Sequence, residues 1–133
     1  MTRSELRENI FKIVFRAPFH DTEEMGEQEQ EYISDLDEAE KDSDIDYIKA
    51  KSAAVIEKLE EIDKLIEDAS KGWSVKRIGR AELAILRVAV YEIKYDSDIP
   101  FKVAVNEALE LSKKYCEPEA GAFINGILSA FAE

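Results

Sequence analysis

The sequence has few of the residues from which small catalytic and metal sites are built. It contains one histidine, His20, and one cysteine, Cys116, far apart in the chain. A single cysteine cannot form a disulfide within the chain, which fits a reducing compartment. The five glycines are scattered and form no phosphate-binding loop. We therefore predict that the protein is not an enzyme, has no cofactor and no metal site, and holds His20 in a surface loop.

Long hydrophobic runs are also absent. No stretch approaches the roughly 20 apolar residues that a membrane-spanning helix needs, and no basic and then apolar leader opens the chain. Hydrophobic residues nevertheless make up 45% of the 133 residues, which is enough for a core without cross-links. We expect a soluble, cytoplasmic protein of one compact domain that makes no contact with membranes.

The charge is strongly acidic and unevenly spread. There are 30 Asp and Glu against 18 Lys and Arg, which gives a formal net charge of −12. Residues 21–71 hold 19 of the acids and six lysines, whereas residues 1–20 hold four basic side chains and two acids. Because nucleic-acid binding depends on cations that meet phosphates, the average composition argues against it. The basic first segment leaves a local binding surface open.

Apolar residues recur at spacings of three and four, which predicts an all-α protein. Thr2 and Glu5 have the spacing of a capping box at the start of a first helix, which Pro18 ends. Arg3, Arg7 and Lys12 fall mostly off the apolar stripe of this helix. Further helices are expected over residues 22–39, 44–70 and 78–95, after Pro100 and after Pro118.

The apolar pattern shows more clearly for some of these helices than for others which side chains face the core. The segment 78–95 is apolar nearly all round, and its length and alanine content favour a buried helix over a strand through Val88-Ala-Val-Tyr. The segment 44–70 would reach about 40 Å as one helix. Its apolar stripe suits a coiled-coil seam or, with helices flanking it on both sides, a bundle helix, which we favour. The predicted inward residues of the last two helices are Val103, Ala104, Ala108, Leu109, Leu111, Phe123, Ile124, Ile127, Leu128 and Phe131.

Two local patterns have competing interpretations. Asn125-Gly126 ordinarily marks a turn, yet it lies inside a helical pattern, where glycine costs about 1 kcal/mol relative to alanine. Close helix packing and a functional need for bare backbone explain it equally well. The run Asp42-Ser-Asp-Ile-Asp46 resembles the start of a calcium loop but lacks its glycine and its last glutamate. Carboxylates at a helix start are the better explanation.

Three blocks stand out in the C-terminal half. They are Ile85-Leu-Arg-Val-Ala-Val-Tyr-Glu-Ile93, Ile99-Pro-Phe-Lys-Val-Ala-Val-Asn-Glu-Ala-Leu-Glu-Leu-Ser-Lys113 and Phe123-Ile-Asn-Gly-Ile-Leu128. Their order and spacing resemble the NusB family of bacterial transcription antitermination factors. Arg7-Glu8 in the first helix and Trp73 before the fourth fit the same layout.

The resemblance implies a fold and a set of partners. The fold would consist of two small helical bundles in one domain, an N-terminal three-helix lobe over residues 1–72 and a C-terminal lobe over residues 73–133. The protein would bind the boxA element of ribosomal RNA leaders together with NusE, which is also a small-subunit ribosomal protein. The pair would act in the antitermination complex of RNA polymerase. Some family members self-associate, which leaves a homodimer open.

The resemblance also assigns residues to these partners by motif position. The first RNA-binding region corresponds to Arg3, Arg7, Phe15 and Arg16. The second, at the start of the last helix, corresponds to Glu119, Ala120, Ala122 and Phe123. Glu82 matches an acidic position that the family uses toward NusE, and Arg87, near it in sequence, is predicted as a second partner-binding residue.

This chain departs from the family pattern at several of these positions. Its first helix has only two arginines before Lys12, and Phe15 stands where many members have tyrosine. The alternative function is therefore an acidic helical adaptor that binds NusE with little RNA affinity of its own. The RNA-binding function requires that Arg7 and Arg16 lie on the same side of the molecule as Phe123 and are not enclosed by glutamates.

Overall fold

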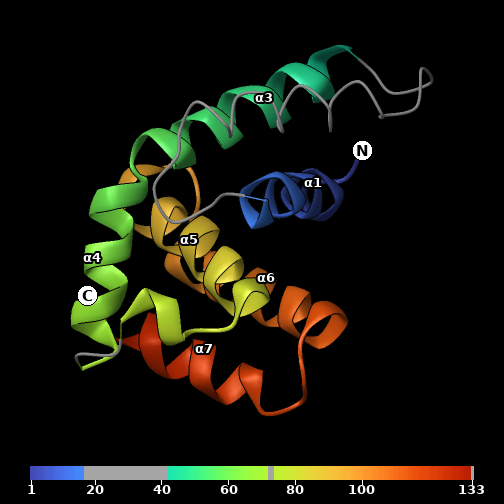
Figure 1. Cartoon of the computed structure of the whole chain (residues 1–133). Coiled ribbons are helices and arrows are strands. Elements are labelled where there is room, and N and C mark those ends of the chain that lie inside the picture. Colours follow the sequence, from blue (N-terminus) through green and yellow to red (C-terminus); the bar gives the residue numbers. More distant parts are fainter. Residues whose placement is uncertain (17–41, 72–73, 133) are drawn as a thin grey trace.

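The computed structural model describes residues 1–16, 42–71 and 74–132, and in these ranges it is all-helical with no strand (Figure 1). The all-α prediction is confirmed. The helix predicted over residues 22–39, together with His20 and Trp73, lies outside the described residues. The elements are α1 (Arg3–Phe15), α3 (Asp42–Glu57), α4 (Leu59–Ala69), the 3-10 turn η1 (Val75–Arg77), α5 (Arg80–Tyr95), α6 (Phe101–Tyr115) and α7 (Ala120–Ser129).

The start of α1 has the predicted capping box. The Glu5 backbone N–H donates to the Thr2 hydroxyl at 3.1 Å, and the Thr2 backbone N–H donates to the Glu5 carboxylate at 3.0 Å. Each bond satisfies a donor that the first turn of a helix leaves unpaired. The cap therefore sets where α1 begins.

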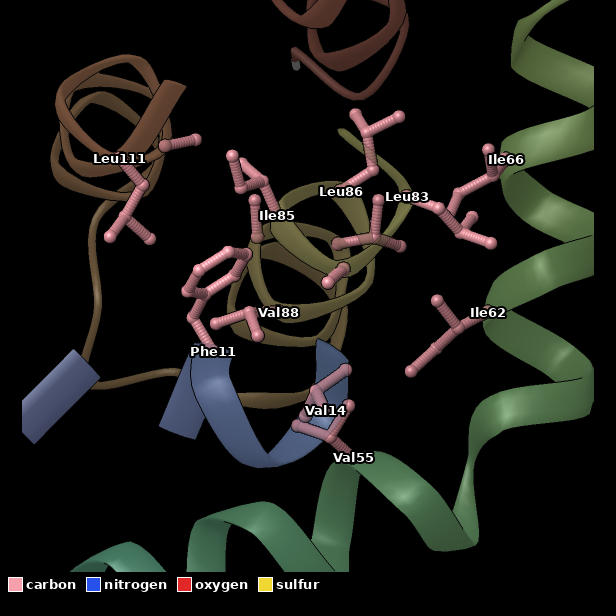
Figure 2. Packing of buried hydrophobic residues seen from close by; sticks show 14 of the residues in the cluster. Phe11, Val14, Val55, Ile62, Ile66, Leu83, Ile85, Leu86, Val88 and Leu111 are labelled. Atoms are coloured by element: carbon pink, nitrogen blue, oxygen red, sulfur yellow. The ribbon is translucent and has the colours of Figure 1, made fainter. Parts of the chain in front are cut away.

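Helix α5 is the centre of the molecule. Side chains of α1, α4 and α6 converge on it (Figure 2), and α7 contacts it from below in the view of Figure 1. Ile85, Leu86 and Val90 of α5 are fully buried. A helix that is apolar on most faces is stable only when neighbours cover it on most sides. The alternative of a strand through Val88 is excluded.

The buried apolar residues form one cluster that includes members from both halves of the chain. Helix α1 packs against α3 and also against α5, so it joins the two halves. The division into lobes at residue 72 stays a prediction.

The expected single helix over residues 44–70 is wrong, because the chain bends at Lys58. Helix α3 ends at Glu57 and α4 begins at Leu59, and Lys58 has a backbone ψ of 9°. The two helices point in clearly different directions in Figure 1, where α3 crosses over α1 and α4 runs down the side of the molecule. The bend lets one apolar stripe cover two surfaces, since α3 packs mainly on α1 and α4 mainly on α5.

Two expectations for the last helices are corrected or refined. Val103 is 42% exposed rather than inward, because the buried stripe of α6 runs through Ala104, Ala108 and Leu111. Gly126 is exposed, and a Cβ added there would meet no described atom within 4 Å. Close packing among the described residues is therefore not the reason for this glycine.

Candidate nucleic-acid interface

Arg7 lies in the interior of the protein rather than on its surface. Arg7 is only 7% exposed, and its Nε donates to both carboxylate oxygens of Glu92 at 3.1 and 2.8 Å. Its Nη1 lies 3.6 Å from a carboxylate oxygen of Glu107 on α6. The requirement stated above is therefore not met by Arg7: two glutamates hold this guanidinium, so a binding groove that includes Arg7 is ruled out and RNA binding has to rest on other residues. The reason is helical spacing, because Arg7 shares a face with Ile10 and Val14.

Glu92, which accepts the hydrogen bonds of Arg7, has a raised pKa. Burial raises the pKa of Glu92 to about 7, although the charge and hydrogen bonds of Arg7 act in the opposite direction. The nearby carboxylates of Asp96 and Glu107 add to the rise in this pKa. The pair therefore joins α1 to α5 at a considerable desolvation cost, as expected for ions removed from water.

Arg87, expected near the NusE contact, is also buried. It is 2% exposed, and its Nε and Nη2 donate to the two oxygens of Asp63 at 2.8 and 2.7 Å. This paired geometry is the strongest that an arginine and a carboxylate adopt. Arg87 thus joins α5 to α4, and its side chain offers no surface to a partner.

The end of α1 does lie at the surface, as predicted for Phe15 and Arg16. Phe15 is 36% exposed, and its ring contacts the buried ring of Phe11 at 6.1 Å between centroids. The guanidinium carbon of Arg80 lies over the Phe15 ring at 5.0 Å from its centroid. The Nη2 of Arg80 also donates to the Phe15 carbonyl at 3.2 Å. Arg80 is a residue that sequence reasoning missed.

A hollow of about 390 Å³ opens beside Phe15. Aromatic rings dominate its walls, and two basic side chains complete them. The lining residues are Phe11, Lys12, Phe15, Arg16, Ala81 and Tyr115. They come from α1, the first turn of α5 and the end of α6, so the packing of α1 on α5 creates this hollow.

Glu8 holds one side of this hollow in place. Its carboxylate accepts from the Tyr115 hydroxyl and from Lys114 Nζ, the latter at 2.6 Å. The hydrogen bond from Lys114, followed by that from Tyr115, lowers the pKa of Glu8 below its ordinary value. Glu8 is therefore ionised at neutral pH and offsets part of the positive charge of Lys12 and Lys114.

The second predicted region lies at the start of α7. Glu119 and Ala122 are exposed, Ala120 is buried, and Phe123 is half-buried against the core. A hollow of about 800 Å³ lies between α6 and α7, with Ala122, Asn125 and Lys113 among its lining residues. Asn125 of the anomalous Asn-Gly pair is thus a surface residue at a hollow.

The first turn of α5 links the two regions. Arg80 touches Phe15 on α1, and the charge of Glu82 acts on the Cys116 thiol between α6 and α7. Burial, followed by the charge and hydrogen bond of Glu82, raises the pKa of Cys116 to about 11. Glu82 itself is half-buried.

The last turn of α6 also borders both regions. Tyr115 lines the hollow beside Phe15, and Cys116 lines the one between α6 and α7. Lys113 and Lys114, just before them, are exposed. The sequence signal for these two cations was available, because the Lys-Lys pair lies a few residues before the second predicted region.

Among the described ranges, no group of three or more His, Cys, Asp or Glu side chains is arranged to hold a metal ion. None of the described helices is both long and apolar enough to cross a membrane.

Comparisons with known proteins agree on one family. The sequence model of the NusB family matches residues 4–133. The transcription antitermination protein NusB of Agathobacter rectalis is 50% identical over 132 residues, which cover 99% of this chain and 100% of that protein. The NusB of Lachnoclostridium phytofermentans is 41% identical over 129 residues, which cover 97% of each chain.

Solved structures give the same result for the fold. T. maritima NusB has a TM-score of 0.85 and 31% identity, and the match covers 99% of this chain and 91% of that one. A chain in the crystal structure of a plectonemic RNA supercoil has a TM-score of 0.83 and 29% identity, with 97% and 92% covered.

Proposed function

The chain belongs to the NusB family, and from that premise we propose that it binds boxA-type RNA together with NusE as a transcription antitermination factor. Its relatives are transcription antitermination proteins, not enzymes.

The hollow beside Phe15 is the observation that carries the proposal. Proteins that bind single-stranded RNA stack bases on aromatic rings and hold the backbone with cations. The hollow combines the rings of Phe11, Phe15 and Tyr115 with the basic side chains of Lys12 and Arg16. Phe15 is the ring that a base would meet first, because it is the most exposed of the three.

The RNA would run from this hollow in two directions. Arg3, which is exposed at the other end of α1, lies about 18 Å away at 1.5 Å per residue. Toward α7, Lys113 and Lys114 lead to the exposed Glu119 and Ala122. Glu119 is suited to accept hydrogen bonds from base N–H groups, and the half-buried Phe123 lies at the same helix end.

Arg7 and Arg87 act in this proposal by positioning other residues. Arg7 holds α1 against α5 and α6, and in this way it positions α1, the helix that carries Phe15. Arg87 fixes α5 on α4. Neither guanidinium has the exposed surface that an RNA or protein contact needs.

The acidic surface supports a basic partner such as a ribosomal protein. Helices α3 and α4 expose Asp46, Glu57, Glu60, Glu61 and Asp68. Opposite charges accelerate association and set its direction. Glu82 remains the candidate for a direct contact with NusE. Self-association stays a prediction.

The test is RNA titration of the protein alone and with purified NusE, using boxA-type RNA and a scrambled RNA of equal length. We expect tighter binding of boxA-type RNA in the presence of NusE. F15A and the double variant K12A/K114A should weaken it, whereas K49A/K64A removes two exposed lysines elsewhere and serves as the matched control. Equal affinity for both RNAs with NusE present would contradict the proposal.

The burial of Arg7 favours the adaptor as a second candidate function, because it removes one cation from an already sparse set. In that case NusE binding persists while RNA binding is unchanged by F15A and R16A. A loss of RNA affinity in those two variants rules the adaptor out.

A further inference from the structure

Arg80 is the residue from which the structure allows a step beyond the proposed function. It is exposed at the first position of α5, and its guanidinium lies over the ring of Phe15. Neither charge pattern nor family motif singled it out. Its contact with Phe15 depends on the packing of α1 against α5.

Two contacts hold the Arg80 side chain in one place. Its Nη2 donates to the carbonyl of Phe15, which is the last residue of α1. The last carbonyls of a helix have no partner within the helix, so a basic side chain is a favourable cap there. The second contact is with the ring, 5.0 Å from its centroid. A long side chain that is already ordered loses less entropy when it binds a ligand.

Phe11, Phe15 and Arg80 contact one another in that order, and they form a series that runs from the core to the surface. Phe11 is 2% exposed, Phe15 is 36% exposed, and Arg80 is exposed. The Arg80 guanidinium lies against the Phe15 ring, and because Arg80 is itself exposed it is the outermost of the three. Planar guanidinium groups are among the surfaces on which unpaired RNA bases stack.

We propose that one unpaired RNA base stacks on the outer face of the Arg80 guanidinium, with Phe15 supporting it from beneath. The proposal rests on the RNA-binding function proposed above and extends it to a specific residue of this chain. The neighbouring cations Lys12 and Arg16 are placed to meet the phosphates on either side of that base. Arg80 thus contributes through its planar shape as well as its charge.

Substitution by lysine separates shape from charge. R80K keeps the positive charge and a donor for the Phe15 carbonyl but loses the flat surface. R80A loses both, and K76A removes another exposed cation of the same region as a control. Each variant is titrated with single-stranded boxA-type RNA carrying 2-aminopurine at successive positions, with NusE present, because the fluorescence of this base reports stacking. Thermal unfolding is measured in parallel to show that each variant is folded.

Stacking of one base predicts that R80K and R80A both bind about tenfold more weakly than the original protein. Both should also lose the fluorescence change at the same RNA position, while K76A changes affinity less than about threefold. R80K with the affinity and fluorescence of the original protein would overturn the proposal, since charge alone would then suffice. If the unchanged protein binds RNA but neither Arg80 variant differs from it, only this inference fails. If the unchanged protein binds no RNA, the proposed function fails as well.

Discussion

Two arginines of this protein are buried in its interior, although arginine side chains are usually exposed. Arg7 and Arg87 are charged, yet they are 7% and 2% exposed, and each is paired with a carboxylate on another helix. Burial of the two charges costs free energy that their attraction only partly returns. Their contribution is therefore best measured by removing one partner and then both.

Arg87→Met should destabilise the protein by about 3–5 kcal/mol, because it leaves the Asp63 carboxylate buried without its cation. The double variant Asp63→Leu/Arg87→Met should regain most of that loss. Urea unfolding measures both free energies. Lys113→Met provides the control: its ion pair with Glu110 is exposed, and the loss should stay below about 1 kcal/mol. A double variant as unstable as the single one would contradict this account of the pair.

The raised pKa of Glu92 predicts a pH dependence of stability. The folded protein holds the Glu92 proton up to about pH 7, whereas the unfolded chain releases it near the ordinary pKa of 4.5. Between these values the folded state binds more protons, so this group's contribution falls as pH rises, by at most about 1.4 kcal/mol per unit. Glu92→Gln cannot titrate and should lack this slope. The difference in unfolding free energy between the original protein and the variant should decrease from pH 5 to pH 7.5. A difference that is constant across this range would contradict the assignment.

At the scale of elements, the bend at Lys58 shows tertiary packing overriding a continuous helical pattern. The apolar residues of α3 and α4 follow one stripe, yet α1 and α5 lie in different directions from it. The backbone turns at Lys58, where the N–H still donates to Val55 at 3.1 Å. Alanine is more stable than glycine inside a helix, and at a turn between two helices this difference in stability should be smaller.

An alanine-to-glycine comparison tests the bend. At Lys64, exposed in the middle of α4, Lys64→Gly should be about 1 kcal/mol less stable than Lys64→Ala. At Lys58 the same comparison should give less than about half of that difference, because the residue is outside both helices. Comparing glycine with alanine at each site cancels the loss of the lysine side chain. Urea unfolding curves provide the numbers, and equal differences at the two sites would mean that α3 and α4 behave as one helix in solution.

At the scale of the whole molecule, the sequence was most informative where local signals agree. The capping box at Thr2 and the apolar run of α5 predicted two helices that the structure contains. The burial of Arg7 could have been inferred from its spacing to Ile10 and Val14, with Glu92 as a matching charge inside an apolar block. The Arg80–Phe15 contact could not, because it depends on how two helices distant in sequence pack. The bend at Lys58 was hidden for the same reason.

The dependence of RNA binding on salt is the property that involves the whole charge distribution. If Lys12, Arg16, Arg80 and Lys114 each meet one phosphate, log K should fall with log salt concentration at a slope of about −3. The acidic helices α3 and α4 should weaken RNA binding only if their carboxylates lie within about 8 Å of the RNA at physiological salt. The variant K12A/K114A should reduce the slope to about −1.4, whereas K49A/K64A should leave it unchanged. A basic partner adds phosphate contacts of its own, so the slope of the complex should be steeper than that of the protein alone. A slope near zero for both would mean that RNA meets none of these cations, whatever the affinity.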